Sequence, residues 1–154
     1  MEYLVVYGLG LAPILAMAGI GRPVDRWAVA AVVASVAIET MAGDVAWGTW
    51  RAGVAITNLG LFLVLWALAE RGERWWLIFA SAAQLLSVLS HVWPWITPGI
   101  HTWSGVGLRR ALWLTLTGIL YLGVLEAWLS RRLALEARLY ENLFPGPGGH
   151  RDVA

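Results

Sequence analysis

Long apolar segments alternate with short charged ones along this chain of 154 residues. Roughly 20 apolar residues in a helix cross a hydrocarbon core about 30 Å thick. Segments of about this length cover residues 3–20, 27–50, 52–69, 75–96 and 111–129. The pattern predicts an all-α integral membrane protein, with a single polytopic bundle of about five transmembrane helices within residues 1–130.

The chain after the last apolar segment is more polar. Residues 131–144 are expected to form a cytoplasmic juxtamembrane helix, because apolar side chains recur on one helix face at Leu133, Ala137, Tyr140 and Phe144. That face suits either the inner headgroups or docking to a partner subunit. Proline and glycine dominate the start of residues 145–154, which predicts a disordered tail.

Arginine placement predicts the orientation. All eleven basic residues are arginine. With the N-terminus outside, eight of them fall in cytoplasmic segments and three in outer segments, and a basic excess in cytoplasmic loops sets membrane topology. The abundance of Ala, Gly, Trp and Arg without lysine suggests a bacterial protein. We therefore expect a multi-pass protein of the bacterial cytoplasmic (inner) membrane, with the N-terminus outside and the C-terminus cytoplasmic.

Tryptophan is concentrated near the ends of the predicted spans. Trp27, Trp75, Trp76 and Trp128 are examples. Indole combines an apolar body with one N–H group, so it favours the headgroup level of a bilayer. These positions indicate interfacial anchors rather than an aromatic cage around a ligand.

Composition narrows the class further. Hydrophobic residues make up 59 % and charged residues 14 % of the chain, against about 45–50 % and 25 % in soluble domains. A net charge of +1 indicates no affinity for nucleic acid, and the absence of cysteine excludes disulfides and thiolate chemistry. The sequence contains no nucleophile elbow, phosphate-binding glycine loop or H-E-x-x-H motif. We assign no catalytic residue, no metal site and no particular cofactor.

Six polar residues are candidates for a ligand-binding site, because polar groups inside a membrane are costly to bury. A helix rises about 1.5 Å per residue. Counted in this way along the predicted spans, most of the six residues fall in the outer half of the bundle, with one near the midplane and one in an outer loop. They are Glu39, Asp44, Asn58, Gln84, His91 and His101. Two of the six residues are acids that interrupt the segment 27–50, so it is open whether that segment spans the membrane completely.

Four interpretations of this group remain open. The residues could be interhelical hydrogen-bonding contacts that hold the bundle together. They could contact a quinone, lipid or isoprenoid in an apolar pocket. His91 and His101 could ligate a metal or haem, with Glu39 or Asp44 completing a zinc-type set. A carboxylate at the depth of Glu39 could also move protons or ions.

The function expected from these patterns is that of a small accessory protein without enzymatic activity. It would serve as a subunit of a larger membrane complex, associate with itself, or bind a lipophilic ligand through the outer polar residues. The alternatives are a small ion- or proton-coupled transporter and a membrane enzyme. Glu39 and His91 are expected to face the bundle interior and to share a site, since a lipid-facing carboxylate at mid-depth is strongly disfavoured.

Overall fold

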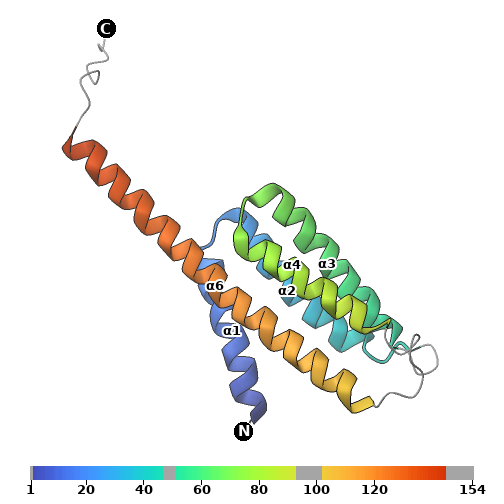
Figure 1. The fold of residues 1–154 in the computed structure, drawn as a ribbon. Helices are drawn as coiled ribbons and strands as arrows, with labels where there is room; N and C mark the ends of the chain where they lie inside the picture. Colours follow the sequence, from blue (N-terminus) through green and yellow to red (C-terminus); the bar gives the residue numbers. More distant parts are fainter. Residues whose placement is uncertain (1, 47–50, 93–101, 145–154) are drawn as a thin grey trace.

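The computed structural model describes residues 2–46, 51–92 and 102–144 (Figure 1). These ranges contain five helices and no strand, which confirms the predicted helical bundle. The helices are α1 (Glu2–Ile20), α2 (Pro23–Ala42), α3 (Ala52–Gly72), α4 (Trp75–Ser90) and α6 (Thr102–Leu143).

The helices form a closed circuit of neighbours. α2 packs on α3, α3 on α4, α4 on α6 and α6 on α1, while a smaller contact between α1 and α2 completes the circuit. The α1–α2 and α3–α4 connections lie at the same end of the bundle, where α6 leaves it (Figure 1). We call this the arginine end, because its two connections and the helix turns beside them carry Arg22, Arg26, Arg71 and Arg74.

The core lies inside this circuit. Met17 from α1, Leu65 from α3 and Leu77 from α4 are completely buried, and Trp76 is almost so. α6 comes close to this centre at Gly123, where a Cβ atom would lie 2.9 Å from the Trp76 ring and 2.8 Å from the Met17 side chain. Glycine at this position therefore lets α6 pack directly against the largest core side chain.

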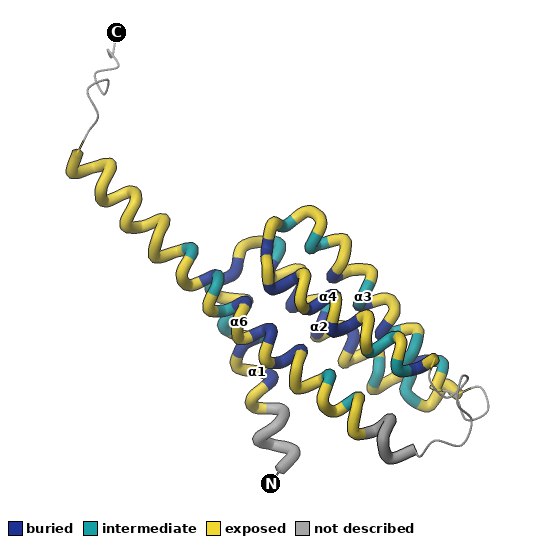
Figure 2. Tube along the Cα trace, in the orientation of Figure 1, coloured by how far each residue is buried: buried dark blue, intermediate teal, exposed yellow. Residues whose placement is uncertain are grey.

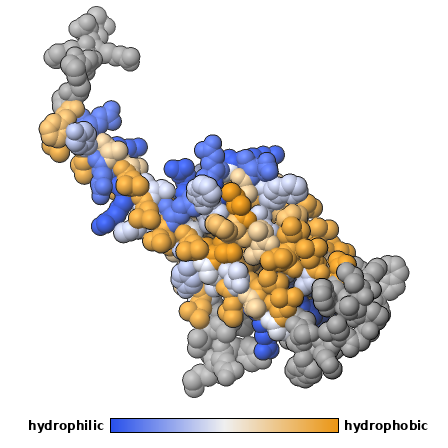
Figure 3. Space-filling model, in the orientation of Figure 1, coloured by the Kyte–Doolittle hydropathy of each residue, from blue (hydrophilic) through white to orange (hydrophobic). Residues whose placement is uncertain are grey.

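The outer surface of the bundle is apolar. Leu63, Phe79, Leu86 and Leu122 are each more than half exposed, and they are typical of large hydrophobic side chains on every helix. Figure 3 shows such side chains covering most of the visible face of the bundle, while hydrophilic ones gather near the arginine end. Monomeric soluble proteins rarely expose apolar patches beyond a few hundred Å².

Two helices in the described residues are long and apolar enough to cross a membrane, namely α3 and the 107–143 part of α6. The described part of α1 and the whole of α4 are apolar but shorter. α4 has 16 residues, which corresponds to about 24 Å. α2 carries the charged residues Asp25, Arg26 and Glu39. The five predicted spans are thus supported as helices, while two of them meet the requirements of a membrane span.

Helix bounds differ from the predicted segments most clearly in α2 and α6. The segment 27–50 corresponds to α2, but this helix starts earlier, at Pro23, and ends earlier, at Ala42. Proline is favourable in the first turn because it needs no N–H partner there and has a helical φ. The last helix begins at Thr102, inside a region that its glycines predict to be a loop. Glycine is tolerated in membrane-type helices, so it is a poor marker of a boundary there.

α6 continues beyond the bundle without interruption. Every residue from 131 to 143 is helical and exposed, so the predicted juxtamembrane helix is a straight continuation of α6 (Figure 2). Arg132 packs over the Trp128 ring at 4.7 Å near the point where the helix leaves the bundle. The predicted disordered tail, 145–154, lies outside the described residues.

Candidate functional site

Asn58 is the centre of a polar group near the end of the bundle opposite the arginine end. Its side-chain amide donates to Glu39 Oε1 at 3.0 Å and to the Val54 carbonyl at 2.9 Å. Its side-chain oxygen accepts hydrogen bonds from Gln84 Nε2 and, at 3.2 Å, from Ser87 Oγ. The contacts join α2, α3 and α4. We call Glu39, Asn58, Gln84 and Ser87 the outer cluster.

A small cavity of about 40 Å³ adjoins the outer cluster. Asn58, Gln84, Ser87 and Arg109 supply polar groups to its wall, and the remaining lining residues are Ala83, Leu112, Trp113 and Leu116. One water needs about 10–15 Å³ of such volume. The cavity therefore has room for a few waters or for a small polar head, such as a hydroxyl or carbonyl group, but not for a whole isoprenoid.

The six predicted site residues separate in the structure. Glu39, Asn58 and Gln84 meet in the outer cluster, whereas Asp44 is exposed on the turn after α2. His91 is buried at the end of α4, and its Nε2 atom has no hydrogen-bond partner in the described part of the chain. His101 lies outside the described residues.

The described residues contain no group of three histidine or acidic side chains that could hold a metal ion. Of the ligands in the metal or haem hypothesis, Glu39 bonds Asn58, and His101 lies outside the described ranges. The arrangement is instead one of neutral amide and hydroxyl groups around Asn58, with the Glu39 carboxyl bonded at one side. Such groups hydrogen-bond one another across helices or orient a small polar ligand.

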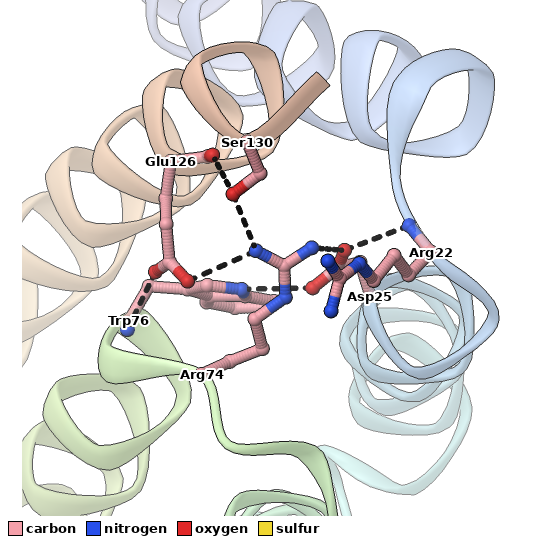
Figure 4. A network of polar contacts seen from close by, with 6 residues as sticks. All are labelled: Arg22, Asp25, Arg74, Trp76, Glu126 and Ser130. Carbon is pink, nitrogen blue, oxygen red and sulfur yellow. Dashed lines mark hydrogen bonds and ion pairs between the residues drawn. The ribbon is translucent and has the colours of Figure 1, made fainter. Parts of the chain in front are cut away.

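A second polar group is buried at the arginine end, and none of its residues is among the six predicted site residues. The Arg74 guanidinium donates to Asp25 Oδ2 at 3.1 Å and to Glu126 Oε1 at 3.0 Å, with Ser130 Oγ at 3.4 Å (Figure 4). Asp25 also accepts from Trp76 Nε1 at 3.0 Å. Asp25 is fully buried and Arg74 is 4 % exposed. We call Asp25, Arg74, Trp76, Glu126 and Ser130 the arginine network.

Two local features of the backbone position this network. Glu73 adopts a left-handed conformation with φ of 49°, which ends α3 and turns the chain so that Arg74 enters the bundle. Residues other than glycine adopt this conformation at a cost of about 1–2 kcal/mol. At the start of α2, Asp25 Oδ2 accepts the Arg22 backbone N–H at 2.8 Å. The same carboxylate therefore caps a helix and holds Arg74.

The sequence does contain a signal for the arginine network. The predicted topology places Asp25 and Arg74 in neighbouring cytoplasmic loops and Glu126 near the cytoplasmic end of the last span. These opposite charges are therefore expected at the same depth in the membrane. The interpretation of Trp76 as an interfacial anchor, which rests on its place at a span end, is wrong. Trp76 is 2 % exposed and bonded to Asp25, whereas its neighbour Trp75 is 72 % exposed.

Comparison of this chain with protein-family models, with curated proteins and with solved structures finds no match. The geometry of the two buried polar groups is therefore the basis for assigning a function.

Proposed function

We propose that this chain is a five-span protein of the bacterial inner membrane that binds the polar head of a lipophilic ligand in the cavity beside the outer cluster. The observation that carries this proposal is that polar groups are buried in the bundle while its outer surface is apolar. Asn58, Arg74 and Gln84 are buried, while large apolar side chains on all five helices are exposed. Lipid is the solvent in which such a surface is stable.

The arginine end supports the proposed orientation. Trp27, Trp75 and Trp128 are exposed there, and tryptophan favours the headgroup level of a bilayer. The four arginines in and beside its connections make this end cytoplasmic by the rule that basic residues stay inside. From this level α3 extends 21 residues, about 32 Å, which matches the thickness of a hydrocarbon core.

Cysteine labelling tests the topology cleanly because the chain has no cysteine of its own. Asp44 lies in the turn at the outer end and Glu136 on the exposed part of α6. We expect Asp44→Cys to react with a membrane-impermeant maleimide on intact spheroplasts, and Glu136→Cys to react only after the membrane is opened. The reverse pattern would contradict the orientation, and recovery of the chain in the soluble fraction would contradict insertion.

The ligand proposal follows from the shape and chemistry of the cavity. Gln84, Ser87 and Asn58 offer hydrogen-bonding groups on one side, and Leu112 and Leu116 of α6 form an apolar wall. Sites for small molecules commonly combine a few polar groups with apolar walls. The volume admits only the head of a ligand, so its apolar tail would extend between helices into the lipid.

Native mass spectrometry of the gently solubilised protein tests this proposal. Wild type should carry one lipophilic molecule per chain. Ala83 is buried and lines the cavity, while the adjacent Ala82 is exposed. Ala83→Val fills the cavity without removing a hydrogen bond, and we expect ligand occupancy to fall about tenfold or more, because overpacking costs about 1–3 kcal/mol.

Ala82→Val is the matched control and should keep the wild-type occupancy. Loss of ligand from both variants, or from neither, would contradict a site in this cavity. A wild-type chain that carries a stoichiometric protein partner and no small molecule would instead favour the role of a subunit in a larger complex or a self-associating protein.

A further inference from the structure

A cavity lies at the arginine end, away from the outer cluster. Its volume is about 290 Å³, near the lower limit of about 300–1,000 Å³ for small-molecule sites. Arg22, Arg74, Ser130 and Arg131 line it together with small and apolar residues. Arginine is the residue best suited to bidentate recognition of phosphate. Three arginines among the lining residues therefore indicate an anion site.

Arg74 contributes a second, independent observation. Its terminal nitrogens are occupied by Asp25 and Glu126, but its Nε atom is buried and has no hydrogen-bond partner in the described residues. A buried donor without a partner costs about 1–3 kcal/mol, more when it is charged. Arg74 lines the cavity, and a small shift of its side chain would let an oxygen atom bound there accept this N–H, because the Nε atom itself is not exposed to the cavity.

The balance of charge fits a singly charged anion. Arg22, Arg74 and Arg131 contribute three positive charges, and Asp25 and Glu126 contribute two negative charges, so one positive charge is left. Figure 4 shows the two carboxylates on either side of the Arg74 guanidinium, holding it in place. The two other arginines are exposed, so their side chains can close on a ligand.

We propose that this cavity binds a phosphate group, as the phosphodiester of an anionic phospholipid in the inner leaflet. The exposed tryptophans near the arginine end place the cavity at the headgroup level, where phosphodiesters are the most concentrated anions. Ile20, Ala127 and Ala134 give the cavity an apolar side, which suits the glycerol and the first acyl carbons. The choice of a phospholipid as the source of the phosphate rests on the proposed membrane insertion. The site itself does not depend on ligand binding at the outer cluster.

The test uses the purified full chain in detergent with three probes: dihexanoyl phosphatidylglycerol, inorganic phosphate and uncharged dihexanoylglycerol. Binding is followed through the thermal unfolding temperature, read by tryptophan fluorescence, and by native mass spectrometry. We expect the phosphatidylglycerol to raise the unfolding temperature and dihexanoylglycerol to leave it unchanged. Arg22→Gln and Arg131→Gln should each weaken binding about tenfold or more, since each removes charge-assisted hydrogen bonds.

Arg138→Gln is the matched control, because Arg138 is exposed on α6 beyond the cavity, and it should bind like wild type. Stabilisation by inorganic phosphate with the same dependence on Arg22 and Arg131 would keep the phosphate site but make free phosphate its ligand. Equal binding by the double variant Arg22→Gln/Arg131→Gln and wild type would overturn the site, as would a wild type that responds to neither phosphate probe. Ala83→Val should bind these probes normally, so failure of the outer cavity and failure of this site are distinguishable.

Discussion

Replacing Arg74 with methionine is expected to destabilise the folded protein by about 3–5 kcal/mol, because it leaves a buried carboxylate without its counter-ion. Asp25 is completely buried and Glu126 is about one-quarter exposed, and both accept hydrogen bonds from the Arg74 guanidinium. Methionine has a similar length but no charge. The measurement is the free energy of unfolding in mixed detergent, obtained by titration with a denaturing detergent.

Two variants separate charge from packing. In Asp25→Asn/Arg74→Met both charges of the more deeply buried ion pair are gone, and much of the lost stability should return, since the introduced amide oxygen can still accept from the Trp76 indole. Arg71→Met, at an exposed position in the last turn of α3, should change the free energy of unfolding by less than about 0.5 kcal/mol. An Arg74→Met variant as stable as Arg71→Met would show that the arginine network contributes nothing to the fold.

The same network shows what a sequence pattern cannot supply. Charged residues between apolar segments are normally solvated, and Arg74 sits in the run from Glu70 to Arg74. Its burial depends on Asp25 and Glu126, which are each about 50 residues away in the chain. The shared depth of the three residues was predictable. The inward turn at Glu73 that directs Arg74 into the bundle was not, because a left-handed residue that is not glycine leaves no clear sequence mark.

Helix positions were easier to predict than helix faces. α3 begins at Ala52, as its apolar run after Arg51 predicted, and ends at Gly72, three residues beyond the predicted limit. Depth arithmetic likewise put Asn58 and Gln84 on neighbouring levels, and the structure joins them. The helices are apolar on nearly all sides, however, so no period of 3.6 residues distinguishes the buried face from the lipid-facing one. The sequence therefore could not show that Glu39 meets Asn58 while Asp44 stays exposed.

Replacing Asn58 with leucine should cost about 2–4 kcal/mol of unfolding free energy. The change removes the donor to Glu39 and the acceptor of Gln84 and Ser87 in a single step. Interhelical hydrogen bonds in membranes contribute about 0.6 kcal/mol on average and up to about 1.7, and groups left buried without partners add to the loss. Thr57→Val is the adjacent control, because the Thr57 hydroxyl donates within its own helix, to the Gly53 carbonyl.

A double-mutant cycle identifies which residue shares the site with Glu39. The sequence led us to expect coupling between Glu39 and His91, but the hydrogen bond in the structure joins Glu39 to Asn58. Glu39→Leu and Asn58→Leu should therefore be non-additive by about 0.5–2 kcal/mol, whereas Glu39→Leu and His91→Phe should be additive. Glu39→Gln should cost little, since an amide oxygen can replace the carboxylate as acceptor for Asn58. Additivity of the Glu39 and Asn58 changes would mean that the outer cluster is not one site, and coupling to His91 alone would restore the arrangement expected from the sequence.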